Sequence, residues 1–390
     1  MLRLIIALGL IGIVAFGPTP SRAEEVPTTR SAAEQAKIVA LMRSNFESLI
    51  NLQPYIARRE TFADAANTET IRGYINGFSD LKHAFPQKFV TQEPGFAAIG
   101  ALFSEYVADI KHDFEGGSRE YVRHKLRTMT GFCMSCHTRV STDKNFQDMG
   151  LKVNDAQLTP FQKAEFLAAT RQFDKAIAAY TELFATVPPS EPGLIDFTHG
   201  VKQVLSITVR VKKDPKKTVD FLTMLAQRED LPDFFRVELA AWRSDAAAWA
   251  AERPEHSALD ANTLILKARK MVERAAKLQL FAADHSGDIS YLRATNYIHE
   301  ALQGKPSAAN RGEALYLLGV SYEALQDPLL WALDELYFEQ CVREYPHTNV
   351  SKKCYARYSM KIYFGYSGSG GTFVPDQEQK KLHGLRKLAE

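Results

Sequence analysis

The pentapeptide Cys133-Met134-Ser135-Cys136-His137 is the part of the chain whose residue types and spacing indicate chemistry most directly. In a Cys-x-x-Cys-His motif on a helix, the two thiols lie about one turn apart, so each can add to a vinyl group of haem while the adjacent imidazole binds the iron. The chain has four Cys and ten His among 390 residues, so the motif is rare by chance. It predicts one covalently attached haem c, with His137 as an axial iron ligand.

Three other interpretations of this Cys pair fit less well. A thioredoxin-like redox pair needs a preceding strand, whereas both flanks of the motif have helical patterns. A zinc site needs a second pair of ligands, and Cys341 and Cys354 are distant in sequence and wrongly spaced. A disulfide between positions i and i+3 of one helix has poor geometry. The haem interpretation is therefore favoured.

The helices that must position this motif are predicted from the spacing of apolar residues. In the segment after Ser118, apolar residues recur at steps of three and four and place both Cys on the core-facing stripe. Four such helices with short connections predict an antiparallel four-helix bundle over residues 24–145, which can hold a cofactor between facing helices. The expected helices are 38–50, which ends before Pro54; 71–85, which Pro86 stops; 94–115, which ends at Gly116-Gly117; and 118–140.

Two of these segments resemble the class II c-type cytochromes, the family of cytochrome c′ and its low-spin relatives. Residues 121–132, followed by the haem motif, resemble that family's last helix, and residues 41–46, Leu-Met-Arg-Ser-Asn-Phe, are similar to its first-helix Leu-Met-x-Ser-x-Phe segment. The resemblance extends over residues 31–142 and does not cover the rest of the chain. It implies that His137 is the proximal ligand and that the first helix supplies the distal face.

The resemblance leaves the distal residue open. One alignment places Val39 over a five-coordinate iron that can bind diatomic gases, whereas another matches Met42 to the axial Met of six-coordinate electron carriers. The two residues are three apart on one helix face, so spacing does not separate them. A His ligand, such as His83, His112 or His124, is a further alternative, although each of these is individually expected to be solvated or to lie behind the ligands.

The rest of the chain is also predicted to be helical, but with a different organisation. Residues 164–188 have the spacing of one tetratricopeptide-type hairpin, and residues 318–346 repeat part of that pattern. The segments between them are helical without matching the repeat. After a polar linker at 146–157, we therefore predict a short α-solenoid over residues 158–385, whose surface would dock a redox partner. We expect the two parts, divided near residue 150, to fold independently.

The N-terminus predicts export. Arg3, an apolar run over 4–16 and a small-x-small ending at Ala23 indicate a signal peptide at 1–23, which places the mature protein in the bacterial periplasm. The run is shorter than the ~20 residues that span a bilayer, so no stable membrane insertion is expected. The 48 basic and 46 acidic residues become 46 and 46 once Arg3 and Arg22 are removed, since 1–23 contains no acid. This balance argues against nucleic-acid partners.

Export also bears on the second Cys pair. Cys341 and Cys354 lie four residues before and five residues after the turn Tyr345–Asn349. If antiparallel helices flank this turn, the two side chains can face each other, and an oxidising compartment favours their pairing. We predict a disulfide.

The favoured function is electron transfer by an exported monohaem cytochrome. The alternative is a five-coordinate haem protein that binds or senses NO or CO. A haem-dependent reductase or peroxidase subunit is less favoured, because the acidic residues fall on predicted exposed faces and form no acid–base pair. The Gly-rich segment 365–372 lacks the Gly-Lys-Ser/Thr ending of a phosphate loop and is predicted to be a turn after the last helix.

Overall fold

The chain folds almost entirely into α-helices, which confirms the predicted all-α class. The computed structural model describes residues 32–81, 94–139, 158–191, 193–252, 259–304, 306–326 and 332–390. Within these ranges the β structure is one small antiparallel hairpin, formed by β1 (Ser367–Gly368) and β2 (Gly371–Thr372). The predicted signal peptide at 1–23 and the predicted linker at 146–157 lie outside the described residues.

The N-terminal part packs one long helix against several shorter ones. Helix α1 contacts α2, α3 and α6, and α5 contacts α3, α6 and α7. Its elements are α1 (Ala32–Ile56), α2 (Arg59–Ala63), the 3₁₀ turn η1 (Ala65–Asn67), α3 (Thr68–Asn76), α5 (Pro94–Glu115), α6 (Arg119–Thr128) and α7 (Thr130–His137). The apolar stripes predicted for these helices form the core, with Ile71, Ile110 and Val122 fully buried.

The expected helix 71–85 is wrong in extent, since α3 ends at Asn76. Gly77, a weak helix former, follows it. Beyond that point side chains replace the helical hydrogen-bond acceptors: the Ser79 amide donates to Asn45 Oδ1 and the Leu81 amide donates to Ser104 Oγ. Leu81 is still buried, although outside a helix. The apolar spacing that predicted this helix therefore predicted the burial of Leu81 correctly and the length of the helix incorrectly.

Helix α1 also differs from expectation, because it runs through Pro54 to Ile56. Proline lacks an amide hydrogen and normally breaks a helix interior. Here it lies in the last turn, so the hydrogen bond that it removes is close to the end of the helix.

The C-terminal part is a succession of helices that pack against their neighbours in sequence. The closest pairs are α9 with α10, α12 with α13, α14 with α15, α16 with α17, and α17 with α18. Its elements are α9 (Pro160–Ala169), α10 (Phe173–Thr186), α11 (Leu194–Ser206), the π-helical turn η2 (Ile207–Val211), α12 (Pro215–Ala226), α13 (Asp233–Ala250), α14 (Ala261–Leu278), α15 (Asp288–Gln303), α16 (Ala308–Leu325), α17 (Leu333–Glu344), α18 (Asn349–Gly365) and α19 (Asp376–Ala389).

Two details of the expected C-terminal organisation are corrected. The Gly-rich segment 365–372 does not follow the last helix, because it forms the β-hairpin between α18 and α19. Helix α19 continues to Ala389, past the expected boundary at 385. Helices α16 and α17 contact each other closely within the segment 318–346: a Cβ atom on Gly319 in α16 would overlap the ring of Phe338 in α17. Glycine at this position therefore lets the two helices approach closely.

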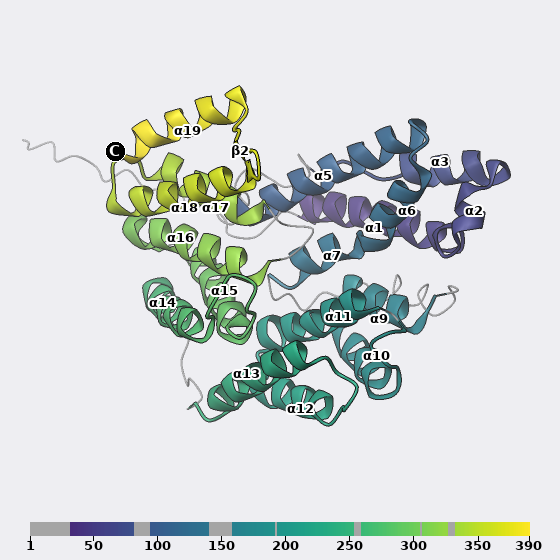
Figure 1. Cartoon of the computed structure of the whole chain (residues 1–390), viewed down its shortest axis with the longest axis horizontal. Helices are drawn as coiled ribbons and strands as arrows, with labels where there is room; N and C mark the ends of the chain where they lie inside the picture. The colour runs from purple at the N-terminus through teal and green to yellow at the C-terminus, as the bar shows by residue number, and fades with distance from the viewer. Residues whose placement is uncertain are drawn as a thin grey trace, which may run out of the picture.

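The two parts of the chain lie against each other at two places (Figure 1). The C-terminal helices form an arc; α9, at one end, contacts α7, and α17, near the other end, contacts α5. One contiguous apolar cluster runs through α1, α5 and α7 into α9 and into α14–α19. At the second contact, Arg139 Nη1 donates to the Tyr337 hydroxyl at 2.9 Å. Helix α7, which carries the Cys-x-x-Cys-His motif, is thus covered by residues from both parts.

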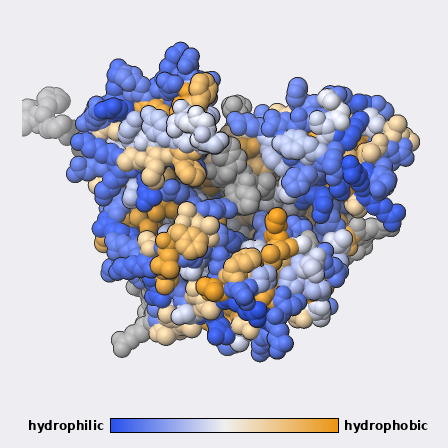
Figure 2. Space-filling model, viewed as in Figure 1, coloured by the Kyte–Doolittle hydropathy of each residue, from blue (hydrophilic) through white to orange (hydrophobic). Residues whose placement is uncertain are grey.

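Hydrophilic residues dominate the face drawn in Figure 2, and hydrophobic residues form separate patches on it. Large apolar side chains that are highly exposed include Ile195, Leu280 and Phe364. Among the described residues, no helix is both long enough and apolar enough to cross a membrane.

Candidate functional site

The motif lies on α7, just after a break in the expected fourth helix. At Met129 the backbone stays in the right-handed helical region, but Phe132 donates to the Met129 carbonyl in an i to i+3 bond, which tightens the turn there. The neighbouring Gly131 has low helix propensity. The expected helix 118–140 is therefore two helices, α6 and α7, and α7 presents Cys133, Cys136 and His137 to one cavity.

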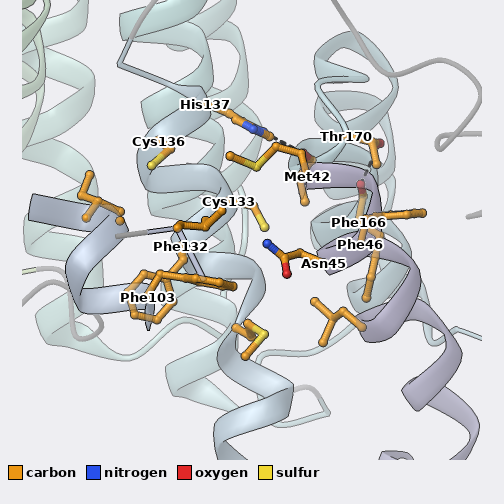
Figure 3. A pocket seen from close by; sticks show the side chains of 16 residues that line it. Met42, Asn45, Phe46, Phe103, Phe132, Cys133, Cys136, His137, Phe166 and Thr170 are labelled. Atoms are coloured by element: carbon orange, nitrogen blue, oxygen red, sulfur yellow. Dashed lines mark hydrogen bonds between the residues drawn. The ribbon is translucent and has the colours of Figure 1, made fainter. Parts of the chain in front are cut away.

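This cavity is enclosed by α1, α5, α7 and α9 and contains about 750 Å³ of space free of atoms, part of it open to solvent (Figure 3). Its wall is mostly aromatic and aliphatic. The lining residues are Met42, Asn45, Phe46, Leu49, Leu81, Ile99, Gly100, Phe103, Met129, Phe132, Cys133, Cys136, His137, Phe166, Ala169 and Thr170.

The structure separates the two candidates for the distal face by position. Met42 lines the cavity together with His137, whereas Val39 is half-buried and is not among the described lining residues. His112 and His124 are exposed and do not line the cavity either. His83 lies outside the described residues. Of the proposed distal side chains that the structure describes, Met42 is thus the one that the fold brings to the motif.

His137 is held in one orientation by the C-terminal part. Its Nδ1 lies 2.7 Å from the carbonyl oxygen of Ala169, at the end of α9. Burial, with a smaller contribution from the positive charge of Arg171, lowers the pKa of His137 to about 3. The ring is therefore neutral near pH 7. Because a carbonyl can only accept, Nδ1 carries the proton and donates it, which leaves Nε2 as the nitrogen with a lone pair for a metal.

The two thiols of the motif are protonated near neutral pH. Burial raises the pKa of Cys133 to about 12 and that of Cys136 to about 11. Both side chains are partly accessible, but they line the apolar cavity. A redox-active or metal-binding Cys pair instead needs a lowered thiol pKa. No group of three or more His, Cys, Asp or Glu side chains that could hold a metal ion occurs among the described residues.

Asn45 places a hydrogen-bond donor at the same cavity. Its Oδ1 accepts from the Ser79 amide at 2.7 Å, which fixes the assignment of oxygen and nitrogen in the side-chain amide. Its Nδ2 is buried and has no hydrogen-bond partner among the described residues. In Figure 3 this nitrogen points into the cavity, beside Cys133. A buried donor without an acceptor is unfavourable, and this nitrogen is placed to donate to an acceptor inside the cavity.

No protein-family model, curated protein or solved structure matches this chain.

These residues fit a c-type haem by the chemistry of their donors. The cavity presents a neutral imidazole, two neutral thiols one helical turn apart, and a thioether from the facing helix. Flat aromatic rings of Phe46, Phe103, Phe132 and Phe166 form much of its wall, which suits a flat, largely apolar macrocycle. Phe103 and Phe132 pack edge to face, with ring centroids 5.7 Å apart.

The buried carboxyl group of Glu165, one helical position before Phe166, is a feature of the site that the sequence pattern does not indicate. The expectation that the acidic residues lie on exposed faces is wrong here, because Glu165 is only 7% exposed. Thr130, the first residue of α7, donates to Glu165 Oε1 at 3.4 Å. Burial, reinforced by the charge of Asp196, raises the pKa of Glu165 to about 8. Glutamate is common on exposed helical faces, so only the packing of α9 on α7 identifies this one.

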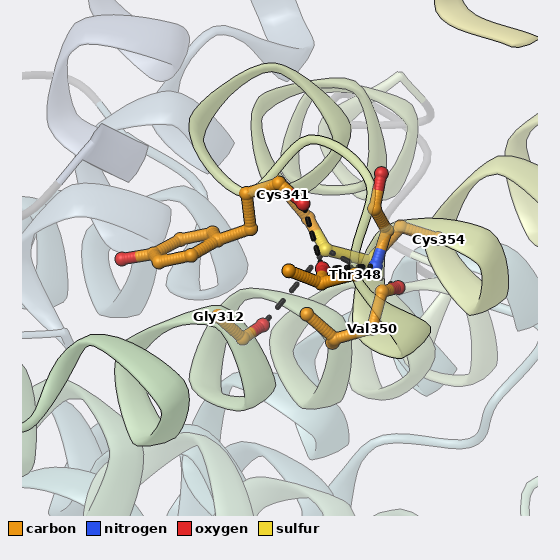
Figure 4. The surroundings of a disulfide bond; sticks show 7 residues. Gly312, Cys341, Thr348, Val350 and Cys354 are labelled. Atoms are coloured by element: carbon orange, nitrogen blue, oxygen red, sulfur yellow. Dashed lines mark hydrogen bonds between the residues drawn. A yellow bond between two sulfur atoms is a disulfide. The ribbon is translucent and has the colours of Figure 1, made fainter. Parts of the chain in front are cut away.

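The second Cys pair lies far from the cavity. Cys341 on α17 and Cys354 on α18 form a disulfide, with Cα atoms 6.2 Å apart (Figure 4). The turn between the two helices is fixed by Thr348, whose hydroxyl donates to the Tyr345 carbonyl and accepts from the Ser351 amide. This disulfide joins two adjacent helices and does not link the C-terminal part to α7.

Proposed function

We propose that this protein is an exported monohaem c-type cytochrome that transfers electrons. Cys133 and Cys136 would form the thioether links, and His137 and Met42 would be the axial ligands. When bound, the haem supplies reversible one-electron redox chemistry. The protein would act in the periplasm after removal of residues 1–23.

The observation that carries this proposal is the meeting of Met42 and His137 at one apolar cavity that also contains both thiols. The two axial candidates come from α1 and α7, which are far apart in sequence. The Ala169 carbonyl orients the imidazole, as hydrogen bonds to the second ring nitrogen commonly do for metal-bound His. An apolar wall limits water access and favours electron transfer over reactions with solvent.

We further propose that the N-terminal helices form a haem-binding bundle and that the C-terminal helices form a tetratricopeptide-like solenoid. The packing of consecutive helices in pairs supports the second assignment. A solenoid of this kind has no redox chemistry of its own, and its extended surface suits it to docking a partner protein that donates or accepts the electron.

Asn45 favours a second candidate, the binding of a diatomic gas at an open iron. If Met42 does not bind the metal, the buried Nδ2 of Asn45 is available to donate to an oxygen or nitrogen atom of a ligand in the same cavity. The two candidates use the same thiols and the same proximal His, and they differ in what occupies the sixth coordination position.

Absorption spectra of the ferrous protein with and without carbon monoxide distinguish the two candidates. For the electron carrier, we expect a six-coordinate low-spin spectrum that carbon monoxide changes little, and a large Soret shift with carbon monoxide in Met42→Ala. Val39→Ala is the matched control, and it should behave as the wild type does. A wild-type protein that binds carbon monoxide readily, with Met42→Ala unchanged from it, would instead support the gas-binding candidate.

A further inference from the structure

Exposed aromatic side chains gather at the end of α18 and on the β-hairpin that follows it. Phe364 and Phe373 are 82% and 78% exposed. The hairpin brings Phe373 back to the end of α18, because the Phe373 amide donates to the Tyr366 carbonyl at 2.9 Å. A contiguous exposed apolar surface usually marks a site of interaction. This cluster, which we call the aromatic patch, consists of Met360, Tyr363, Phe364, Tyr366 and Phe373.

The aromatic patch lies in a strongly basic part of the chain. Residues 349–390 contain eight Lys and Arg and three Asp and Glu, which gives 8 − 3 = +5. The whole chain carries +2, so residues 1–348 carry 2 − 5 = −3. Helix α18 itself contains no acidic residue. The positive charge is thus concentrated where the aromatic side chains are exposed.

Cations and patch residues share the outward face of α18. Successive residues of an α-helix are about 100° apart, so Lys352 and Tyr363 lie on one line along α18, and Lys353, Met360 and Phe364 lie on a second line about 100° from the first. The buried residues of α18 lie on the opposite side. Helix α19 packs on α17 and α18 at the end of the arc (Figure 1).

Only part of this positive charge is compensated within the protein. The cations of α18 and α19 that pair with carboxylates are Arg357, Lys361, Lys381 and Arg386. In contrast, Lys352, Lys380 and Lys387 are exposed and form no ion pair with any described residue. Tyr363 and Arg386 line one open cavity, so α19 adjoins the aromatic patch.

We propose that the aromatic patch and the lysines around it bind the surface of an anionic membrane. The aromatic rings would enter the boundary between headgroups and acyl chains, and the lysines would contact the lipid phosphates. Each Lys or Arg near such a surface strengthens binding about fivefold. This binding is peripheral and requires no membrane-spanning helix. It is also independent of the proposed haem function, because none of these residues lines the haem cavity.

The kind of cation at this surface favours a membrane over a protein partner. Protein interfaces are enriched in aromatic residues, Met and Arg, but they are depleted in Lys. Here the exposed cations without an ion pair are lysines. A lysine is a point charge on a flexible stem and needs no fixed partner geometry, which suits it to a fluid layer of phosphate groups.

Co-sedimentation with lipid vesicles tests this proposal. The protein is the mature chain from Glu24 onward, since the apolar run over 4–16 would itself bind lipid. The probes are vesicles of equal amounts of phosphatidylglycerol and phosphatidylcholine, and vesicles of phosphatidylcholine alone. At low ionic strength we expect binding to the anionic vesicles and at least about tenfold weaker binding to the neutral ones. Salt at about 0.5 M should weaken the binding, because it screens the charges.

Variants of the aromatic patch establish which residues enter the lipid. Phe364→Ser/Phe373→Ser should weaken binding at least about tenfold, because two rings no longer leave water. Leu280→Ser/Phe281→Ser is the matched control, since these side chains are 84% and 65% exposed between α14 and α15. It should change binding by less than about twofold. Circular dichroism checks that each variant is folded.

Charge-removing variants test the lysines. Lys352→Gln/Lys353→Gln should weaken binding to the anionic vesicles about tenfold or more. Lys216→Gln/Lys217→Gln is the matched control, because it also removes two adjacent exposed lysines, at the start of α12. The proposal is overturned if the wild type does not bind the anionic vesicles, a result that would favour an acidic protein partner. It is also overturned if neutral vesicles bind equally well, or if either control weakens binding as much as its counterpart does.

Discussion

Replacing Glu165 with glutamine should stabilise the protein, by an amount that grows with pH. Burial raises the pKa of this carboxyl group from 4.5 to about 8. The folded state therefore holds a proton that the unfolded chain releases at lower pH. The difference of about 3.5 pKa units corresponds to about 5 kcal/mol when Glu165 is ionised in both states. Glutamine keeps the shape of the side chain and its ability to accept from Thr130, but it has no charge to bury.

The sign of the pH dependence of this stability gain follows from proton linkage. Because the folded state binds more protons than the unfolded state between the two pKa values, the free energy of unfolding of the wild type falls as pH rises through this window. Below the unfolded pKa both states are protonated and the penalty is absent. The gain from Glu165→Gln should therefore be small near pH 4.5, about 3 kcal/mol near pH 7, and about 5 kcal/mol near pH 9.

Urea unfolding of both proteins at these three pH values measures the effect. Only the difference between wild type and variant is used, so the titration of other groups cancels. Glu182→Gln, at an exposed position on α10, is the control and should give less than about 0.5 kcal/mol at every pH. If Glu165→Gln raises the free energy of unfolding by the same amount at every pH, the reasoning is refuted. Such a result would show that folding does not shift the pKa of this carboxyl group.

Three further predictions follow from the packing. Replacing both Cys341 and Cys354 with serine should lower the free energy of unfolding by about 2–4 kcal/mol, measured by urea unfolding, while leaving any haem spectrum unchanged; an equal stability would contradict a formed disulfide. Phe166→Ala should destabilise by about 3–5 kcal/mol and perturb the haem spectrum, whereas the exposed Phe364→Ala should do neither. A fragment of residues 24–145 should retain covalent haem but unfold at lower urea concentrations and show a shifted Soret band, because it lacks α9; a spectrum and stability equal to those of the full chain would show that α9 is dispensable.

The sequence predicted which residues meet at the cavity better than it predicted their surroundings. The core-facing stripe before the haem motif could be predicted because Val122, Leu126 and Met129 recur at helical spacing. All three are buried in the structure. The hydrogen-bond acceptor of His137 could not be predicted, because it is the backbone carbonyl of Ala169. Every residue has such a carbonyl, so the residue type does not identify it. Such contacts depend on how distant helices pack.

The extent of the second helix shows a related limit. Apolar residues continue at helical spacing beyond Asn76, but the Asn45 and Ser104 side chains capture the amides of residues 79 and 81. These are tertiary hydrogen bonds, and a local pattern cannot reveal them. The sequence also gives no sign that Asn45 lies at the cavity, because an asparagine on a helix is ordinarily solvated. Only the fold shows that its amide nitrogen is buried at the cavity.

The most direct test of the central claim is the intact mass of the protein after expression with the periplasmic c-type maturation machinery. The account predicts a chain that begins at Glu24 and carries the added mass of one haem, which persists after denaturation and is absent from a Cys133→Ala/Cys136→Ala double variant. A mature wild-type chain with the mass of the polypeptide alone would contradict it.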